Sequence, residues 1–85
     1  MASFEYTVKD KIGIHARPAG KLVQMARPLS STIMITKNGM SADATRLMSV
    51  LSLGVRCGDT ITISAEGGDE EASLEAVKKF MEENL

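Results

Sequence analysis

The Asn38–Gly39 pair constrains the fold of this chain more than any other local feature, because it predicts a tight β-hairpin. Both residues tolerate the positive φ angles that a two-residue hairpin turn requires. The preceding segment STIMITK places Ile33 and Ile35 on one face of a strand, and a short return strand is expected from Met40 to Ala42. A sheet that contains such a hairpin cannot be entirely parallel, so folds built only from parallel strands are excluded.

Elsewhere the apolar residues follow two periods, which predict further strands and helices. A period of two is typical of a strand with one buried face, whereas spacings of three and four are typical of one face of a helix. The segments FEYTVK and GDTITISAEGG follow the first rule, and the runs after Ala16 and Asp69 follow the second. The residues predicted to face the core in these segments are Phe4, Tyr6, Val8, Ala19, Leu22, Val23, Ala26, Leu29, Ile61, Ile63, Ala65, Leu74, Val77, Phe80 and Met81.

Particular residues mark the ends of the helices. Pro28 is predicted to end the first helix, because the residue before a proline resists helical backbone angles. Thr45 is expected to cap a short second helix, and Gly54 to end it in a left-handed conformation. Asp69 is expected to cap the third helix, whose first turn carries two glutamates that suit the positive end of the helix dipole.

The predicted order of strand, helix, strand, strand, helix, strand, helix (βαββαβα) favours an α+β fold. We expect an open-faced β-sandwich, in which three helices cover one face of a four-stranded, mainly antiparallel sheet. The first strand and the strand after the first helix should run in the same direction, with another strand between them. Residues 1–85 suffice for a single domain. A domain of this size buries about 60 to 65% of its unfolded surface, so any pocket should be shallow.

The composition argues against binding to nucleic acids or membranes. Ten Lys and Arg against eleven Asp and Glu give a formal net charge of −1, without the basic excess of a phosphate-backbone binder. One Tyr and two Phe are too few for a base-stacking platform. No apolar run could span a membrane or form a signal peptide, so a cytoplasmic protein is expected. Cys57 has no partner for an internal disulfide, and without a heptad pattern we expect a monomer.

The motif GIHARPAG contains the only histidine of the chain, at the predicted start of the first helix. With Pro18 at an early helical position, the backbone donors of Ala16 and Arg17 remain free, and with the helix dipole they form a site for an anion. The imidazole of His15, whose unperturbed pKa is about 6.5, can attack a phosphoryl donor at neutral pH. Gly13 would let the backbone turn so that the ring is exposed, and Arg17 would offer a planar fork of donors to the phosphoryl oxygens.

Taken singly, these residues have simpler explanations. A lone histidine near a helix start is more often a surface or capping residue, and a lone arginine is usually a solvated charge; their combination favours a function. The sequence holds no metal-ligand cluster, no acid pair, no hydroxyl nucleophile with a base and no glycine-rich phosphate loop, so no metal or cofactor is expected. A single histidine can accept and donate a phosphoryl group but cannot position a second substrate. We therefore expect a carrier with a covalent phosphohistidine, whose catalysis is shared with partner enzymes.

Three segments resemble the HPr family, the histidine phosphocarriers of the bacterial phosphoenolpyruvate-dependent sugar phosphotransferase system. GIHARPAG is similar to the family signature Gly-x-His-x-Arg-Pro-Ala, LMSVLSLGV to its second helix and GDTITISAEG to its last strand. The resemblance implies that Enzyme I, charged from phosphoenolpyruvate, phosphorylates Nδ1 of His15, and that the group passes to an EIIA domain of a sugar permease. It also implies that Ala16, Arg17 and Pro18 hold the phosphoryl group and that His15 and Arg17 carry the transfer.

The resemblance also assigns a partner-docking surface around the histidine and on the second helix. That helix is too apolar for one buried stripe, so part of it should face water; core packing is expected for Val50 and Leu53. Methionine suits such a surface because it can repack against several partners. The implied docking residues are Ala16, Ala19, Gly20, Leu47, Met48 and Leu51.

Arg46 departs from the family pattern, because low-GC Gram-positive members carry at this position a serine that a regulatory kinase phosphorylates. The neighbouring hydroxyl residues do not align with that serine, so this regulation is predicted to be absent. A cation at a helix start costs about 0.3 to 1 kcal/mol if unpaired, which makes Arg46 a candidate contact for an acidic partner surface. Gly20 stands where the family usually has alanine, and it should slightly loosen the first helix.

The alternative is a non-carrying regulatory relative that binds a transcription factor or an enzyme through Leu47, Met48 and Leu51. Regulatory relatives can lack the histidine, whereas this chain retains His15 and Arg17 in the full motif. The sequence therefore favours the phosphoryl carrier.

Overall fold

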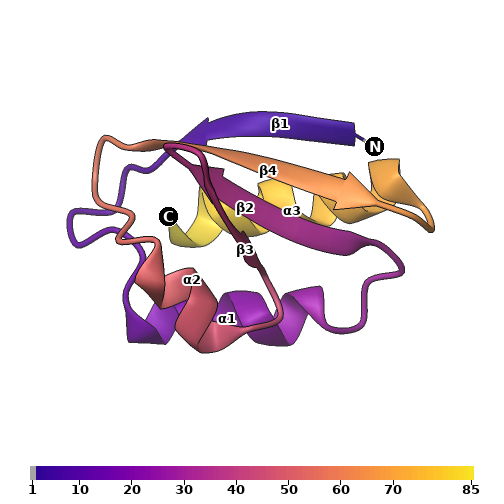
Figure 1. The fold of residues 1–85 in the computed structure, drawn as a ribbon, viewed down its shortest axis with the longest axis horizontal. Helices are drawn as coiled ribbons and strands as arrows, with labels where there is room; N and C mark the ends of the chain where they lie inside the picture. The colour runs from indigo at the N-terminus through magenta and orange to yellow at the C-terminus, as the bar shows by residue number, and fades with distance from the viewer. Residues whose placement is uncertain (1) are drawn as a thin grey trace.

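The computed structural model describes residues 2–85 and has the predicted βαββαβα order. Figure 1 shows the strands as one sheet with the helices packed against it. The elements are β1 (Ala2–Thr7), α1 (Ala16–Ala26), β2 (Thr32–Lys37), β3 (Met40–Asp43), α2 (Leu47–Ser52), β4 (Thr60–Glu66) and α3 (Glu70–Asn84). Hydrophobic period predicted β1, β2, β4, α1 and α3, whereas β3 was predicted from the Asn38–Gly39 turn and α2 from the residues expected at its two ends.

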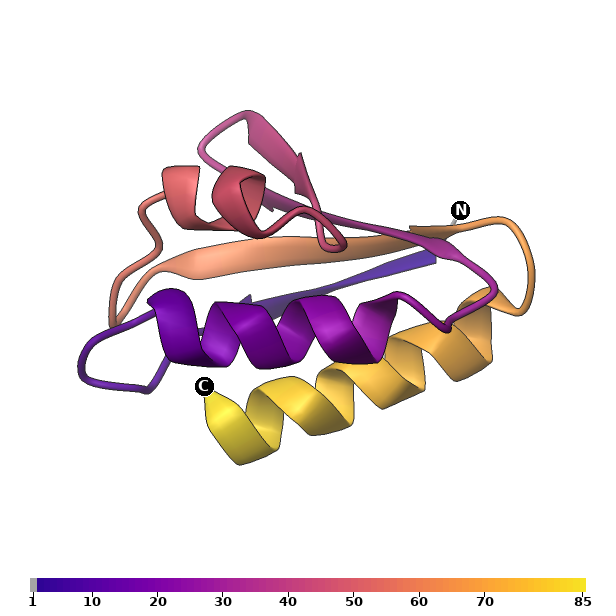
Figure 2. The same ribbon diagram turned by 90° about the horizontal axis from the view of Figure 1, so that it is seen from below.

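The sheet has the strand order β1-β4-β2-β3, and every neighbouring pair is antiparallel. β4 therefore lies between β1 and β2, which run in the same direction, as the sequence predicted. The turned view in Figure 2 shows α1 and α3 side by side along one face of the sheet. α2 packs against α1 and β3, near the edge strand. The predicted α+β open-faced sandwich is confirmed.

The core lies between the sheet and the helices. Ile33 and Ile35 of β2 and Ile61 and Ile63 of β4 are almost fully buried, because alternate residues of both strands point toward the helices. α1 and α3 contribute the core residues Leu22, Val23, Val77 and Met81, whereas Leu74, Phe80, Phe4 and Tyr6 are only partly buried at its margin.

The hairpin and the cap of the last helix form as predicted. Asn38 and Gly39 have φ angles of 50° and 81° and make the two-residue turn between β2 and β3. β3 extends one residue beyond its predicted end, to Asp43. Asp69 caps α3 by accepting a hydrogen bond from the Ala72 N–H over 3.1 Å.

The predicted N-cap of α2 is wrong. Arg46, not Thr45, occupies the N-cap position, and its side chain makes no capping hydrogen bond. Thr45 is occupied elsewhere, because its N–H and its hydroxyl both donate to Asp43 Oδ1, over 2.8 and 2.6 Å. This local turn, built by an aspartate two residues earlier, includes Thr45, and the helix begins only after Arg46. Gly54 does end the helix segment with a φ of 63°.

Candidate functional site

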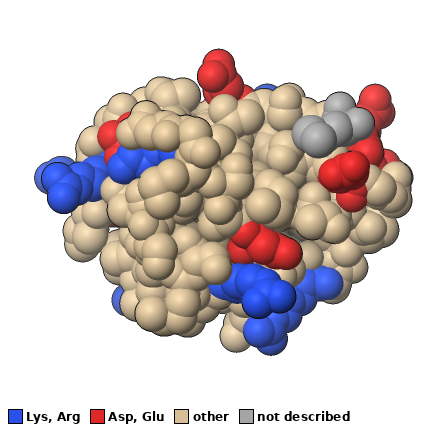
Figure 3. Space-filling model, in the orientation of Figure 1, with Lys and Arg blue, Asp and Glu red and all other residues tan. Residues whose placement is uncertain are grey.

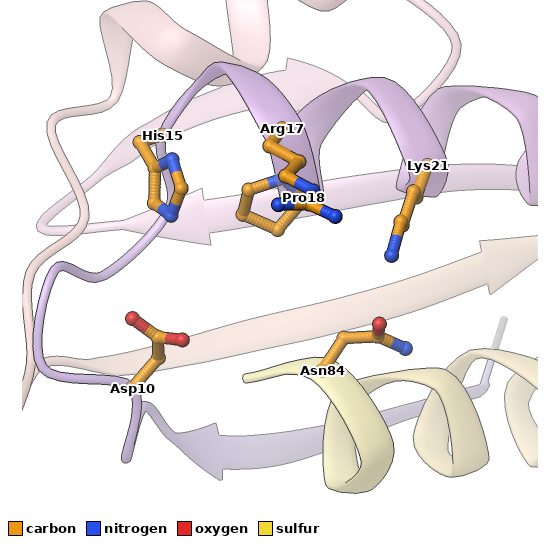
Figure 4. A pocket seen from close by; sticks show the side chains of 6 residues that line it. All are labelled: Asp10, His15, Arg17, Pro18, Lys21 and Asn84. Carbon is orange, nitrogen blue, oxygen red and sulfur yellow. The ribbon is translucent and has the colours of Figure 1, made fainter.

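His15 is the N-cap residue of α1 and is partly exposed to solvent. Its backbone is extended, with φ −120° and ψ −176°, and its ring makes no capping hydrogen bond to its own helix. Figure 4 shows the ring at one wall of a shallow pocket of about 230 Å³. The imidazole is therefore accessible and is not engaged in a structural role at the helix start.

Gly13 and Ile14 explain why the ring faces outward. Gly13 has a φ of +82°, and a Cβ there would collide with the Val55 carbonyl oxygen, so only glycine fits. The Ile14 N–H donates to the same Val55 oxygen over 3.0 Å, and the Ile14 side chain is buried. The chain thus turns against residue 55, and His15 is left at the surface.

The first turn of α1 presents two free backbone donors. Helical bonding begins when the Ala19 N–H donates to the His15 carbonyl oxygen over 3.0 Å. Pro18 has no N–H, and within residues 2–85 the N–H groups of Ala16 and Arg17 have no protein acceptor. Two amides and the positive end of the helix dipole therefore meet beside the imidazole, an arrangement that suits an anion. Pro18 lines the pocket but supplies no donor itself.

Two cations from successive turns of α1 share the pocket with His15. The Arg17 and Lys21 side chains lie on the same wall as the ring in Figure 4, and Arg17 is exposed. The opposite wall carries Asp10 and Asn84. Arg17 was predicted from the motif. The Arg17-to-Lys21 spacing of four residues, which places both on one helix face, was the available signal for Lys21.

Asp10 and Asn84 could not be recognised from the motif because they come from other segments. Asp10 is held by its own loop, where its Oδ1 accepts the Ile12 N–H over 2.9 Å. The Asn84 side chain donates to the Phe80 carbonyl oxygen over 3.0 Å in the last turn of α3. The N–H groups of Lys9 and Asp10 donate to the Leu85 carbonyl oxygen, which joins the end of α3 to this loop.

The residues expected to dock partners divide into exposed and buried groups. Met48 is 73% exposed and Leu47 is 38% exposed, while Leu51 is partly buried. Residues other than Lys, Arg, Asp and Glu, drawn in tan, cover most of the surface in Figure 3 where α2 lies in Figure 1. Ala16 is exposed and Gly20 is partly exposed. Val50 and Leu53 are buried, as predicted.

Ala19 requires a correction. It has no exposed surface, because it lies on the inner face of α1 and packs in the core, so it cannot contact a partner directly. Ile12, which was not among the predicted docking residues, is 68% exposed in the loop before the histidine. An isoleucine in the polar segment DKIG was the available signal, since a short loop gives it little chance of burial.

Arg46 is exposed at the start of α2 and lies near an acidic group of the same chain. The hydroxyl and the N–H of Thr45 lower the pKa of the Asp43 carboxyl, and the charge of Arg46 lowers it further. This attraction offsets part of the cost of a cation at the helix start.

Residues 2–85 contain neither a metal-ligand cluster nor a membrane-spanning helix. No group of three or more His, Cys, Asp or Glu residues is arranged there to hold a metal ion. None of the helices in this range combines the length and the apolar character needed to cross a membrane.

Comparison with known proteins gives consistent matches over nearly the whole chain. Residues 2–83 match the family model described as "PTS HPr component phosphorylation site". The chain is 39% identical over 85 residues to the phosphocarrier protein HPr of Mycoplasma genitalium, with 99% of this chain and 97% of the relative covered. The solved histidine-containing phosphocarrier protein of Mycoplasma superposes with a TM-score of 0.92 at 35% identity, covering 96% and 93% of the two chains.

The chain is also similar to a protein that is named Crh rather than HPr. The Bacillus subtilis catabolite-repression protein Crh superposes with a TM-score of 0.78 at 33% identity, covering 100% of this chain and 98% of Crh. Its crystal structure is described as a dimer with a swapping domain.

Proposed function

This chain belongs to the HPr family of the phosphotransferase system, and on that premise we propose that it carries a phosphoryl group on His15 from Enzyme I to the EIIA domains of sugar permeases. The single observation that carries the proposal is the accessible imidazole beside two unpaired amides at the start of α1. A covalent phosphohistidine needs both a nucleophile and a prepared site for its oxygens. His15 supplies the first, and Ala16 and Arg17 supply the second.

The transfer we propose is a direct displacement at phosphorus. The lone pair of Nδ1 of His15 attacks the phosphoryl group of the donor, a nitrogen–phosphorus bond forms, and the electron pair of the broken bond stays with the donor. The N–H groups of Ala16 and Arg17 and the Arg17 guanidinium then face the phosphoryl oxygens. The reverse displacement passes the group to the acceptor. The chain itself is thus a carrier, and the partner enzymes complete the catalysis.

The surface around His15 supports docking by proteins rather than by small substrates. The pocket is shallow, and the exposed apolar residues Met48, Leu47 and Ile12 lie on α2, which packs against α1, and on the loop that leads into α1. Such residues are costly in water and become favourable when a partner covers them. We assign the docking surface to Ala16, Gly20, Leu47, Met48, Leu51 and Ile12, and we omit Ala19 because it is buried.

A Crh-like regulatory role is the second candidate, and the likeness to Crh is the observation that favours it. In that role the α2 surface would bind a transcription factor or an enzyme without phosphoryl transfer. The presence of His15 in a prepared anion site favours the carrier. We further propose that the protein is cytoplasmic and monomeric; sedimentation at several concentrations would expose a dimer such as that of Crh.

The decisive experiment is incubation with Enzyme I and phosphoenolpyruvate. We expect a phosphate that is labile in acid and stable in base, the behaviour of phosphohistidine, and we expect His15→Ala to abolish it. Wild-type protein that folds but takes no label would refute the carrier function and leave the regulatory one.

Arg17→Ala should keep the fold and slow transfer by about ten- to a hundredfold, because it removes charge stabilisation from an exposed position without disturbing packing. Arg27→Ala, an exposed arginine just beyond the other end of α1, is the matched control and should transfer normally. Unchanged transfer in Arg17→Ala would show that the arginine does not serve the phosphoryl group.

A further inference from the structure

Lys37, at the end of β2, joins the two ends of the loop that connects α2 to β4. Its Nζ donates to the Gly54 carbonyl oxygen over 2.7 Å and lies 2.9 Å from Asp59 Oδ2. The Lys37 and Asp59 side chains are only 16% and 32% exposed. Asp59 Oδ2 also accepts the Arg56 N–H over 2.8 Å. The contact with Lys37, followed by that with Arg56, lowers the pKa of the Asp59 carboxyl, so this carboxylate is ionised at neutral pH.

The loop held by this bridge is the surface against which the segment before His15 rests. The Ile14 N–H donates to the Val55 carbonyl oxygen over 3.0 Å, and both side chains are buried. Gly13 lies so close to this loop that a Cβ would overlap the Val55 oxygen and the Cα of Arg56. The backbone position of His15 therefore follows the position of residues 55 and 56.

From these contacts we propose that Lys37 is a positioning residue for phosphoryl transfer. It acts through the 54–59 loop on Gly13 and Ile14, and through them on the ring of His15. The inference rests on the proposed carrier function, because only a ring that reacts with a phosphoryl group must be held in an accurate position. Displacement of a reacting group by about 1 Å can cost about a hundredfold in rate, so partial loosening of the loop should cost about three- to tenfold.

Three variants distinguish the loss of the two Lys37 contacts from the loss of a positive charge elsewhere on the surface and from a general loss of stability. Lys37→Met removes both contacts of Nζ but keeps an unbranched side chain of similar length. Lys37→Arg keeps a cation with several donors and should restore both contacts. Lys79→Met removes an exposed lysine of α3 and is the matched control.

Two measurements on the folded protein report the effect. Amide hydrogen exchange compares Ile14, at the proposed contact, with Ile63, in the central strand β4; their ratio is insensitive to global unfolding that opens both sites together. The rate of His15 phosphorylation by phosphoramidate reports ring positioning without any protein partner, so altered docking cannot contribute.

We expect Lys37→Met to raise the Ile14-to-Ile63 exchange ratio by about tenfold and to slow phosphorylation by about three- to tenfold. Lys37→Arg and Lys79→Met should resemble the wild type in both measurements. If Lys37→Met does not fold, Asp59→Asn takes its place, since it weakens the Lys37 contact and keeps an acceptor for the Arg56 N–H.

Two outcomes would overturn the positioning role: an unchanged rate in the folded Lys37→Met protein, or a slowed rate with an unchanged exchange ratio. Failure of the wild type to take label from Enzyme I and phosphoenolpyruvate would count instead against the proposed carrier function. The two failures are therefore distinguishable.

Discussion

The site depends on a few residues whose backbone conformation matters as much as their side chains. Pro18 removes one donor from the first turn of α1, and the remaining free amides belong to Ala16 and Arg17. Gly13 turns the chain so that His15 faces outward. The motif predicted the exposed imidazole and the free amides, because the residues that form them are adjacent in the sequence. It could not predict that Asp10 and Asn84 complete the pocket, since their approach to His15 depends on the packing of distant segments.

Gly13→Ala should destabilise the protein by about 2 to 4 kcal/mol, because it adds a strained positive φ to an overlap with the Val55 backbone. Gly54→Ala is the matched control. Gly54 also has a positive φ, but nothing lies within 4 Å of an added Cβ, so only the strain of about 1 kcal/mol should remain. Urea unfolding of both variants measures the difference. Equal losses would show that the close approach to Val55 has no energetic weight.

At the scale of helices and strands, periodicity together with turn and helix-end signals identified every element, and the N-cap of α2 was predicted wrongly. Thr45 was predicted to cap α2, but its N–H and its hydroxyl both donate to Asp43 Oδ1, and the helix begins one residue later, after Arg46. Ala19 was assigned both to the core face and to the docking surface. It has no exposed surface in the structure and therefore belongs to the core. The Lys37 bridge to Gly54 and Asp59 lay beyond sequence reasoning, because it joins segments that only tertiary packing brings together.

Arg46→Ser should stabilise the protein by about 0.5 to 1 kcal/mol, because serine is a good N-cap and the change removes a cation from the start of α2. Asp43 keeps both hydrogen bonds from Thr45 in this variant. Arg46→Ala removes the same cation without adding a cap, so the difference between the two variants isolates capping. Urea unfolding provides the comparison. A net loss of stability in both would mean that the attraction between Arg46 and Asp43 outweighs the helix dipole.

At the scale of the whole molecule, acid should weaken the fold through particular carboxyl groups. The pKa of Asp43 is lowered by its bonds from Thr45, and the pKa of Asp59 is lowered mainly by Lys37. Each carboxyl binds protons less readily in the folded chain than in the unfolded one, so protonation favours unfolding. Their contribution is complete above the ordinary carboxyl pKa of about 4 and is lost as the pH falls through the lowered folded-state values.

We therefore expect the free energy of unfolding to decrease between about pH 5 and about pH 2. Asp43→Asn and Asp59→Asn should each make this decrease shallower, because the substituted group no longer titrates. Glu83→Gln, at an exposed carboxyl of α3, serves as the control. Urea unfolding across this range tests the expectation. Identical slopes in all variants would show that other groups govern acid sensitivity.

The central position of β4 has a consequence for biosynthesis. β1 pairs only with β4, through partners such as Ala2 with Ala65, and β2 needs β4 on its other side. During translation β1 therefore has no strand to pair with until residue 66 has left the ribosome. The β2–β3 hairpin can form earlier, since its partners are close in sequence. The sheet is completed only after β4 has been made, so nascent chains that stall before β4 expose an unpaired strand edge to aggregation.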